Sequence, residues 1–264
     1  MNIQIATLNT KGMATPSKFK NTATLLKSYK NIDIFTLQEL NITSTNLKFI
    51  TKKWLNALVW TTHTAILINN PKIIINNTFA TNKRALIIDL ALGSHSFRIE
   101  TVYLPPDRRN RLQFLETWQP SANQDNYILT GDFNTNIFPQ NRMASTQARP
   151  DSSRDVLLGK LDQLIDTQVL AAVLTMQTFS QNTRNNNILL TKLDYIFLST
   201  ALATHKVELE TLAGNSDHLL LVARIKSKNE HNHNPQWKLN SRTLRDKSAI
   251  GRAADLLNNS TRWD

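Results

Sequence analysis

Short apolar segments rich in β-branched residues recur along the first 225 residues of the chain. Segments of this kind, separated by polar and turn-forming residues, are typical of β-strands. Many of them follow one another without an intervening helical stretch, which favours an α/β fold with largely antiparallel sheets over a doubly wound parallel sheet. The predicted strands contain the sequences NIQIATLN, IDIFTLQEL, TAILINN, IIINNTFA, ALIIDLAL, FRIETVYL, NYILTGDFN, LDYIFLS and LLLVARIK.

Helical periodicity appears in three stretches between these strands, at residues 16–30, 107–118 and 152–172. In the first, Thr15 is the expected N-cap and Pro16 occupies the first helical position. Helical spacing of apolar residues supports the other two stretches. These residues are Leu112, Leu115 and Trp118, and then Val156, Leu157, Leu161, Leu164 and Ile165.

The composition changes near residue 226. The sequence KSKNEHNHNP is polar and charged, which is typical of a linker. The segment that follows is too short and too poor in core residues to form a domain. We therefore expect a folded domain at residues 1–225 and a polar linker and tail at residues 226–264.

Composition excludes several classes of protein. The chain has 264 residues, of which 41% are hydrophobic, enough for a sizeable core. Cysteine is absent, which excludes disulfides, thiolate zinc sites and cysteine nucleophiles. No apolar run approaches the roughly 20 residues of a membrane span, and the first residues lack the features of a secretory signal. We expect an intracellular protein that does not associate with a membrane.

The net charge of +11 is unevenly distributed. Residues 1–100 carry a net charge of +8, residues 101–225 carry −1, and residues 226–264 carry +4. A basic protein with a local acidic pocket suits a polyanionic substrate and a bound cation. An excess of lysine that only aids solubility explains the net charge equally well. Specific motifs are needed to decide between a polyanionic substrate and simple solubility.

Polar residues interrupt the apolar pattern at the ends of five predicted strands. Taken singly, each has an ordinary explanation: a turn cap, a strand-end charge, an ion pair with Lys192, or a buried histidine with satisfied hydrogen bonds. Taken together, oxygen ligands with a single imidazole suit Mg²⁺ better than zinc. The residues are Asn9 in ATLNTKG, Glu39 in FTLQEL, Asp132 and Asn134 in GDFN, Asp194 in KLDYIF, and Asp217 and His218 in NSDHLLL.

In this order, the segments LN, QE, GDFN, LDYIF and SDH resemble the endonuclease/exonuclease/phosphatase superfamily, which includes DNase I and the apurinic/apyrimidinic endonucleases. The closest resemblance is to the endonuclease domain of LINE-type (non-LTR) retrotransposons, over roughly residues 1–225. The tail sequence WKLNSRTLRDKSA resembles the stretch that leads to reverse transcriptase in LINE polyproteins. The resemblance implies a four-layered α/β sandwich, with two mostly antiparallel sheets packed together and flanked by helices.

The same resemblance implies a metal site. Glu39 would be the principal Mg²⁺ ligand, Asn9 would assist it, and Asp217 would lie beside it. Many repair members of the superfamily have an acidic residue where this chain has Lys11. A charged lysine cannot bind a metal, so either Lys11 contacts a DNA phosphate or a water fills the role. This departure argues against a two-metal scheme and against a repair-type abasic endonuclease.

The resemblance also implies catalytic roles. Asp132 would orient or deprotonate the attacking water, and Asn134 would hold the phosphate or that water. Asp194 would hydrogen-bond His218 and fix its tautomer, and His218 would stabilise charge on the scissile phosphate. Because Asp132 and Asn134 stand two residues apart, an extended chain would point both to the same side. Gly131, just before them, is expected to let the DNA backbone come close.

Candidate DNA contacts lie elsewhere along the chain. The sequence SQNTRNNNILLT (180–191) occupies the place of a DNA-probing hairpin in LINE endonucleases, where Arg184, Asn185 and Asn186 would enter a groove. A plain asparagine-rich turn explains this sequence equally well. Thr178 is expected to touch the DNA backbone near the cut, and Tyr103 in TVYLPP matches a family tyrosine that contacts the phosphate. Further candidate phosphate contacts, equally compatible with solvated faces, are Lys11, Lys18, Lys20, Arg108, Arg109, Arg149 and Arg154.

Together these features predict a Mg²⁺-dependent endonuclease, in which Mn²⁺ can substitute, that nicks one strand of double-stranded DNA. The 3′-hydroxyl would prime target-primed reverse transcription. Expected partners are nuclear DNA, element RNA and a reverse transcriptase domain in the same polypeptide, and the isolated domain is expected to be monomeric. The alternatives are an abasic-site repair endonuclease, a phosphatase acting on phosphoinositides or another phosphoester, and a nucleic-acid-binding module that has kept the fold but lost its chemistry. The +11 charge weighs against the phosphatase, and the complete set of polar residues weighs against the inactive module.

Overall fold

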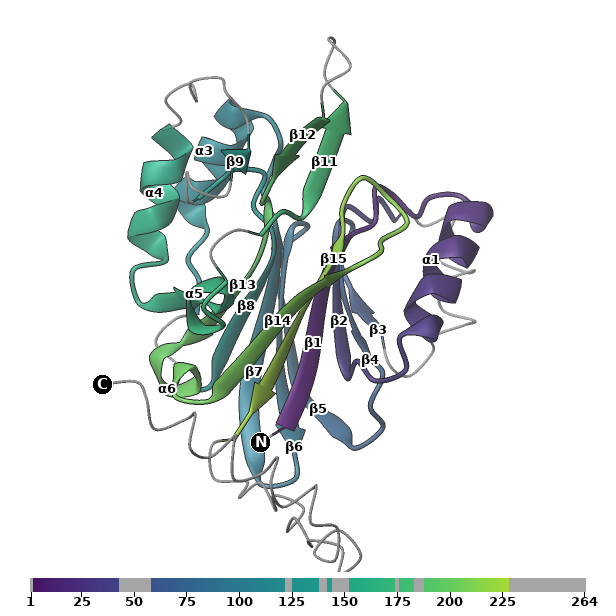
Figure 1. Cartoon of the computed structure of the whole chain (residues 1–264), viewed down its shortest axis with the longest axis vertical. Helices are drawn as coiled ribbons and strands as arrows, with labels where there is room; N and C mark the ends of the chain where they lie inside the picture. The colour runs from purple at the N-terminus through teal and green to yellow at the C-terminus, as the bar shows by residue number, and fades with distance from the viewer. Residues whose placement is uncertain are drawn as a thin grey trace, which may run out of the picture. The chain divides into compact units, whose positions relative to one another are not determined.

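The structure is a computed structural model, and Figure 1 shows the arrangement of its elements. Residues Met1–Ser227 form one compact unit, and residues 228–264 lie outside the described residues. The predicted tail therefore falls almost wholly outside the described part. None of the described helices is long and apolar enough to cross a membrane. The structure describes residues 2–42, 58–121, 125–137, 142–143, 152–173, 176–182 and 188–227.

The first sheet has six strands in the order β14-β15-β1-β2-β4-β3. Strands β1 and β2 are parallel, and all other neighbours are antiparallel. The strands are β1 (Asn2–Asn9), β2 (Ile34–Gln38), β3 (Leu58–Trp60), β4 (Thr64–Ile68), β14 (Lys206–Leu212) and β15 (Leu220–Lys226).

The second sheet also has six strands, in the order β10-β13-β8-β7-β6-β5, with β7 and β8 parallel. Its strands are β5 (Ile73–Asn82), β6 (Ala85–Leu92), β7 (His95–Tyr103), β8 (Tyr127–Asp132), β10 (Leu164–Asp166) and β13 (Asp194–Ser199). A small third sheet contains β11 (Phe179–Asn182), β12 (Ile188–Thr191) and β9 (Arg142–Met143).

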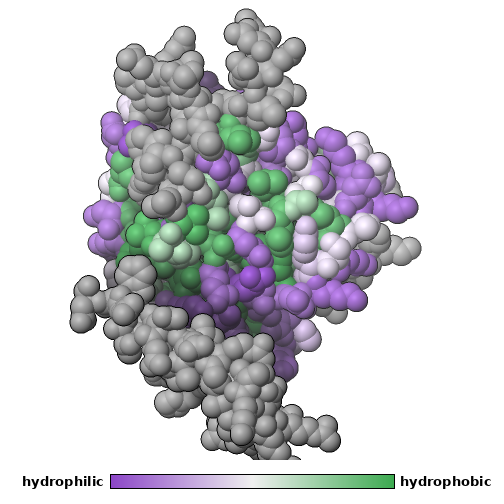
Figure 2. Space-filling model, viewed as in Figure 1, coloured by the Kyte–Doolittle hydropathy of each residue, from purple (hydrophilic) through white to green (hydrophobic). Residues whose placement is uncertain are grey.

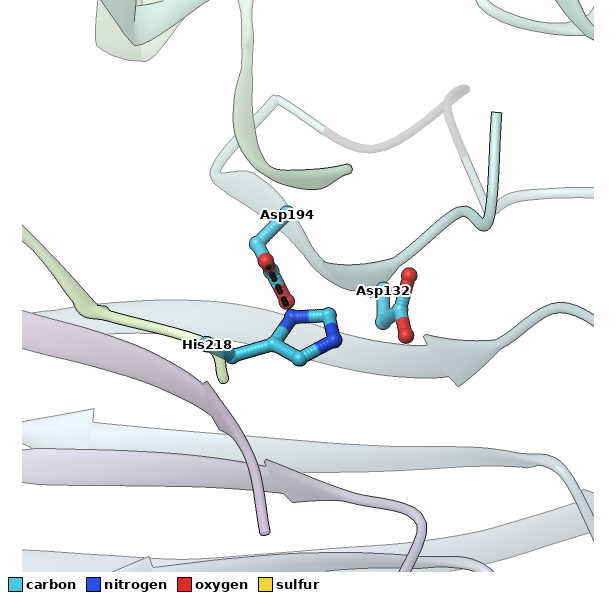
Figure 3. Close-up of side chains that lie close together, drawn as sticks. All are labelled: Asp132, Asp194 and His218. Carbon is cyan, nitrogen blue, oxygen red and sulfur yellow. Dashed lines mark hydrogen bonds and ion pairs between the residues drawn. The ribbon is translucent and has the colours of Figure 1, made fainter. Parts of the chain in front are cut away.

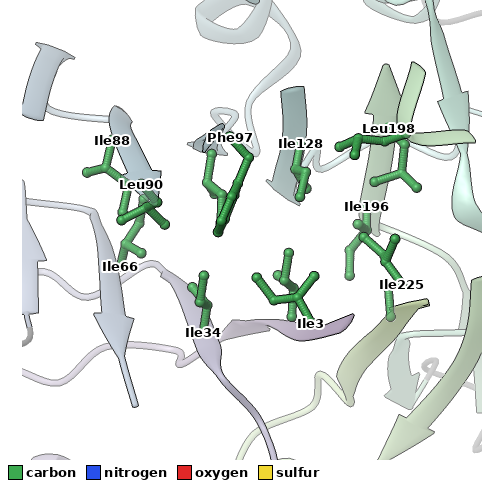
Figure 4. Close-up of a cluster of buried hydrophobic side chains, with 14 of the residues drawn as sticks. Ile3, Ile34, Ile66, Ile88, Leu90, Phe97, Ile128, Ile196, Leu198 and Ile225 are labelled. Carbon is green, nitrogen blue, oxygen red and sulfur yellow. The ribbon is translucent and has the colours of Figure 1, made fainter. Parts of the chain in front are cut away.

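The main core lies between the two large sheets. Ile3 and Ile34 from the first sheet face Ile128 and Ile196 from the second, and all four side chains are fully buried (Figure 4). Core residues alternate along these strands, as Ile3 and Ile5 do on β1 and Ile196 and Leu198 do on β13. The sequence pattern of short apolar strands therefore builds a two-sheet sandwich.

Helices cover the outer faces of both sheets. Helix α1 (Pro16–Ser28) packs Phe19 and Leu26 against the first sheet, and α3 (Arg108–Thr117) and α4 (Ser152–Lys160) pack Leu115 and Leu157 against the second. The shorter helices are α5 (Thr167–Leu170) and α6 (Thr200–Ala203). The order helix, sheet, sheet, helix confirms the predicted four-layered α/β sandwich.

Two of the three predicted helices are confirmed. Thr15 caps α1 by accepting a hydrogen bond from the Lys18 backbone N–H at 3.3 Å, and Pro16 begins the helix. Asp107 caps α3 by accepting a bond from the Asn110 N–H at 2.9 Å. Such caps satisfy backbone donors that have no partner within the helix.

The third predicted helix, at residues 152–172, is wrong between Lys160 and Thr167, since Thr167–Leu170 form the separate short helix α5. Helix α4 ends at Lys160, and Leu164–Asp166 form β10, which pairs with the end of β13. Val156, expected on the buried face, is 42% exposed. Pairing at the sheet edge overrides the local helical periodicity, because long-range hydrogen bonds are not visible in a sequence pattern.

Candidate active site

Two parallel strand pairs and one antiparallel pair bring the predicted polar residues to one edge of the two sheets. In the first sheet Asn9 ends β1 opposite Gln38 of β2, so Glu39 lies beside Asn9. In the second sheet Tyr103 of β7 and Asp194 of β13 are both register partners of Asp132 on β8. Strand pairing thus assembles residues that are distant in sequence.

Asn9 connects the two sheets. Its Nδ2 donates to Asp132 Oδ2 at 2.7 Å and to Glu39 Oε2 at 3.0 Å, and its Oδ1 accepts the Lys11 backbone N–H at 2.8 Å. Asn9 is 2% exposed, so these bonds are shielded from water. The amide therefore fixes the separation of two carboxylates that would otherwise repel each other.

Asp132 and Asn134 face each other, although not along an extended strand. Strand β8 ends at Asp132, and Asn134 has a left-handed φ of 47°. Its backbone N–H donates to Asp132 Oδ1 at 2.8 Å, and its Nδ2 donates to the Leu104 carbonyl at 2.8 Å. The expected proximity is found, but a turn produces it instead of strand alternation.

Asp194 and His218 form the predicted pair. Nδ1 of His218 lies 2.8 Å from Asp194 Oδ2, and both side chains are buried. Figure 3 shows the far side of the imidazole directed toward Asp132. The other carboxylate oxygen of Asp194 is buried without a hydrogen-bond partner.

Burial and neighbouring charges shift the pKa values of Asp132 and His218. Burial raises the pKa of Asp132 to about 7, and the negative charge of Asp194 adds to the rise. Burial opposes protonation of His218, but the charge and hydrogen bond of Asp194, with the charges of Asp132 and Asp217, outweigh it and raise the pKa of His218 to about 9. Between these two values the site favours an ionised Asp132 beside a protonated His218.

Lys11 and Asp217 form an ion pair on the more open side of the site. Lys11 Nζ lies 2.7 Å from Asp217 Oδ2, and the two side chains are 60% and 28% exposed. The hydrogen bond and charge of Asp217 raise the pKa of Lys11. Asp217 is therefore bound to an ammonium group at the place where the sequence predicted a carboxylate beside a metal.

The family model for the endonuclease/exonuclease/phosphatase family matches residues 6–218, a span that runs from before Asn9 to His218. The chain belongs to this family. Members of the family are metal-dependent phosphodiesterases and nucleases, and the chain is accordingly a metal-dependent phosphodiester hydrolase. A comparison with curated proteins found no match.

Solved structures agree with this family assignment at the level of the fold. The endonuclease domain of TRAS1, a telomere-specific non-LTR retrotransposon, has a TM-score of 0.57 and 14% identity, covering 86% of this chain and 99% of that domain. The AP endonuclease LMAP from Leishmania major has a TM-score of 0.61 and 16% identity, covering 85% and 88%. Truncated TDP2 from Caenorhabditis elegans has a TM-score of 0.59 and 16% identity, covering 86% and 98%.

The donor set of this phosphodiesterase site fits a hard divalent cation. Among the described residues, one cluster places ligand atoms of three ligating side chains within 4.8 Å of one another: Asp132, Asp194 and His218. The two carboxylates of this cluster, including the Asp194 oxygen that is buried without a hydrogen-bond partner, suit Mg²⁺ or Mn²⁺, whereas a protonated His218 does not ligate a metal. Glu39 lies outside it, so its role as principal ligand stays a prediction.

Thr178 does not offer its hydroxyl to DNA, contrary to the sequence-based expectation. It is fully buried, and its hydroxyl oxygen accepts the backbone N–H groups of Leu193 at 3.1 Å and Asp194 at 3.0 Å. Its carbonyl accepts the Leu219 N–H at 2.7 Å. Thr178 therefore holds the backbone of both Asp194 and the segment after His218.

Gly131 is required by the sheet, which corrects the expectation that it admits the DNA backbone. Its φ is +149°, a region that residues with a Cβ rarely adopt. A Cβ there would lie 2.0 Å from the carbonyl oxygen of Val102, its register partner on β7. Gly131 permits the close approach of β7 and β8 that aligns Tyr103 with Asp132.

The sequence interpretation missed a group of residues around Tyr103. The guanidinium of Arg84 lies 4.9 Å from the Tyr103 ring centroid, and the imidazole of His63 lies 6.0 Å from it. Burial, followed by the charge of Glu39, raises the pKa of Tyr103. The sequence does contain a signal for this group: the basic pair Lys83 and Arg84 in a tight turn between two predicted strands. The pattern alone could not show that sheet packing brings this turn close to Glu39.

The remaining predicted DNA contacts divide into two groups. Arg154 Nε donates to the Ile137 carbonyl at 2.9 Å, so this arginine supports the loop after Asn134. Lys18 Nζ donates to the Lys11 carbonyl at 3.2 Å, while Lys20 is exposed on α1. Four predicted contacts lie outside the described residues: Arg149, Arg184, Asn185 and Asn186.

Proposed function

We propose that this phosphodiester hydrolase is a DNA endonuclease that nicks one strand of a duplex and leaves a 3′-hydroxyl. One observation supports the proposal most strongly. A buried carboxylate, Asp132, faces an imidazole that Asp194 holds protonated near neutral pH. This is the pairing of a base and a cation that phosphodiester hydrolysis needs.

The chemistry follows from this pairing. Ionised Asp132 accepts a proton from a water while the water oxygen forms a bond to phosphorus. The bond from phosphorus to the 3′-oxygen breaks, and that oxygen leaves with the electron pair and takes a proton from solvent water to become the 3′-hydroxyl. His218 stabilises negative charge on the phosphate, and Asn9 and Asn134 hold Asp132 in place. A divalent cation, when bound, would neutralise charge on the phosphate oxygens.

The positive charge of the chain supports a polyanionic substrate. The first 225 residues carry a net charge of +7, and α1 carries exposed lysines in a region whose surface is mostly hydrophilic (Figure 2). One similar structure, Danio rerio TDP2, was solved with a single-strand DNA product, at 15% identity and a TM-score of 0.58. These features favour DNA over a small phosphoester.

The LINE context is the more specific part of the proposal. It is supported by Lys11, which departs from the acidic residue of repair members, and by the tail resemblance at residues 226–264. The TRAS1 domain matches over 99% of its length. We propose that nicking primes reverse transcription of an element RNA, with nuclear DNA as target.

A nicking assay tests the proposal. Supercoiled plasmid and a duplex oligonucleotide with one abasic site are incubated with the protein in Mg²⁺, in Mn²⁺ or in EDTA. We expect metal-dependent conversion of the plasmid to nicked circles, with cuts clustered at particular sequence steps and 3′ ends that a polymerase extends. Asp162→Ala, which removes an exposed carboxylate, is the matched control and should behave as wild type.

Two results would redirect the interpretation. Cleavage confined to the abasic duplex would replace the LINE proposal with a repair endonuclease. Tight DNA binding without any cleavage in either metal would contradict the nuclease proposal.

A further inference from the structure

The Lys11–Asp217 ion pair is held in place from both ends. Lys11 has a left-handed φ of 51°, its N–H is bound by Asn9 Oδ1, and its carbonyl accepts the Lys18 ammonium. Left-handed backbone is uncommon for lysine and usually reflects constraint by the surroundings. These bonds hold the backbone from which the Lys11 side chain reaches Asp217.

The Asp217 side of the pair is equally constrained. The Asp217 carbonyl accepts the Ser180 N–H at 3.0 Å, and Ser216 Oγ donates to the Asn9 carbonyl at 2.9 Å. The Ser216 hydroxyl also accepts the His218 N–H at 3.1 Å. These bonds join the loop that carries Lys11 to the loop that carries Asp217 and His218.

The Lys11 ammonium interacts with two carboxylates. It bonds Asp217 directly, and the negative charge of Glu39 also acts on it. A divalent cation shared by Glu39 and Asp217 would have to displace this ammonium or lie close to its positive charge. Either course disfavours a second metal ion, because Asp217 already has a cation bound.

We propose that Lys11 is a built-in cation that occupies Asp217 and so limits the active site to one divalent metal ion. The inference rests on the metal dependence of the family and not on the proposed DNA substrate. It assigns Lys11 a positioning role: it neutralises a carboxylate that would otherwise be free to take a metal.

Counting bound Mn²⁺ tests this without substrate. Free Mn²⁺ gives a strong electron paramagnetic resonance signal that disappears on binding, so a titration gives the number of ions bound per chain. We expect one ion for wild type and two for Lys11→Met, which releases Asp217. The double variant Lys11→Met/Asp217→Asn should return to one, and Lys27→Met, which removes an exposed charge at the end of α1, should stay at one.

Three results would overturn the proposal. They are two ions bound to wild type, one ion bound to Lys11→Met, or two ions retained by the double variant. Thermal melting of each variant confirms that it is folded, and since Lys11 lies at the surface its replacement should leave the melting temperature within a few degrees of wild type. Because DNA is absent from the titration, a failed nicking assay and a failed ion count can be told apart.

Discussion

Asp132 and His218 ionise in opposite senses within one buried site. Burial holds a proton on the carboxyl, whereas three neighbouring carboxylates hold a proton on the imidazole. A general base works best when its pKa is near the working pH. Enough of it is then ionised to accept a proton, and it is still basic enough to take that proton from water. The residue-scale consequence is a narrow range of pH in which both groups are in the form the reaction needs.

The rate of nicking should therefore be bell-shaped with pH. Below about pH 7 Asp132 is protonated and cannot accept a proton, and above about pH 9 His218 loses the charge that stabilises the phosphate. Single-turnover nicking at saturating metal between pH 5.5 and 10 measures both limbs.

Asp194→Asn should shift the alkaline limb to lower pH. The substitution removes the charge and the hydrogen-bond acceptor that raise the pKa of His218, so the imidazole loses its proton earlier. The same pH series measures the shift. An alkaline limb that stays in place in Asp194→Asn would show that His218 is not the titrating group.

At the scale of elements, the base of the β11–β12 hairpin organises the catalytic pair. Phe179 forms a β-bridge with His218, and their rings lie 4.9 Å apart. Thr178 binds the N–H groups that begin the Asp194 strand. The hairpin thus supports both partners of the pair from one side.

Thr178→Val should reduce the nicking rate by roughly tenfold or more and lower the free energy of unfolding by about 1–2 kcal/mol, because two buried N–H groups lose their acceptor. DNA affinity, measured by fluorescence anisotropy, should change little. Thr178→Ser keeps the hydroxyl and should stay near wild type. Loss of DNA affinity with an unchanged rate would instead restore Thr178 as a DNA contact.

Gly131→Ala should be severely destabilising, by at least about 3 kcal/mol, because a Cβ would overlap the Val102 carbonyl. Gly159 in α4 is the matched control, since nothing lies within 4 Å of its Cβ position. Gly159→Ala should raise stability by about 0.5–1 kcal/mol through helix propensity. Urea unfolding measures both, and an unchanged midpoint in Gly131→Ala would contradict the packing described for β7 and β8.

The sequence predicts the part of this site that local sequence signals determine. Strand-end polarity and motif order identified Asp132, Asp194 and His218, which the structure brings together. It could not place the buried Thr178 or the Arg84 turn, since their roles depend on contacts between segments far apart in the chain. For the same reason the helix predicted at 152–172 missed β10, whose pairing lies across the sheet edge.

At the scale of the molecule, the compact unit Met1–Ser227 contains the three buried clusters and every site residue that the structure places. A variant ending at Ser227 should therefore keep the melting temperature and the nicking rate of the full chain at moderate salt. Circular dichroism and the plasmid assay check this. A variant that fails to fold would show that residues 228–264 contribute to the stability of the domain.

The most direct test of the central claim is the single-turnover rate of plasmid nicking by wild type, Asp132→Ala and His218→Ala at pH 8, with and without metal. We expect wild type to nick in Mg²⁺ or Mn²⁺ and not in EDTA. Each variant should fold and bind DNA but nick at least ~10²-fold more slowly. Nicking by a folded Asp132→Ala or His218→Ala protein at the wild-type rate would contradict the account.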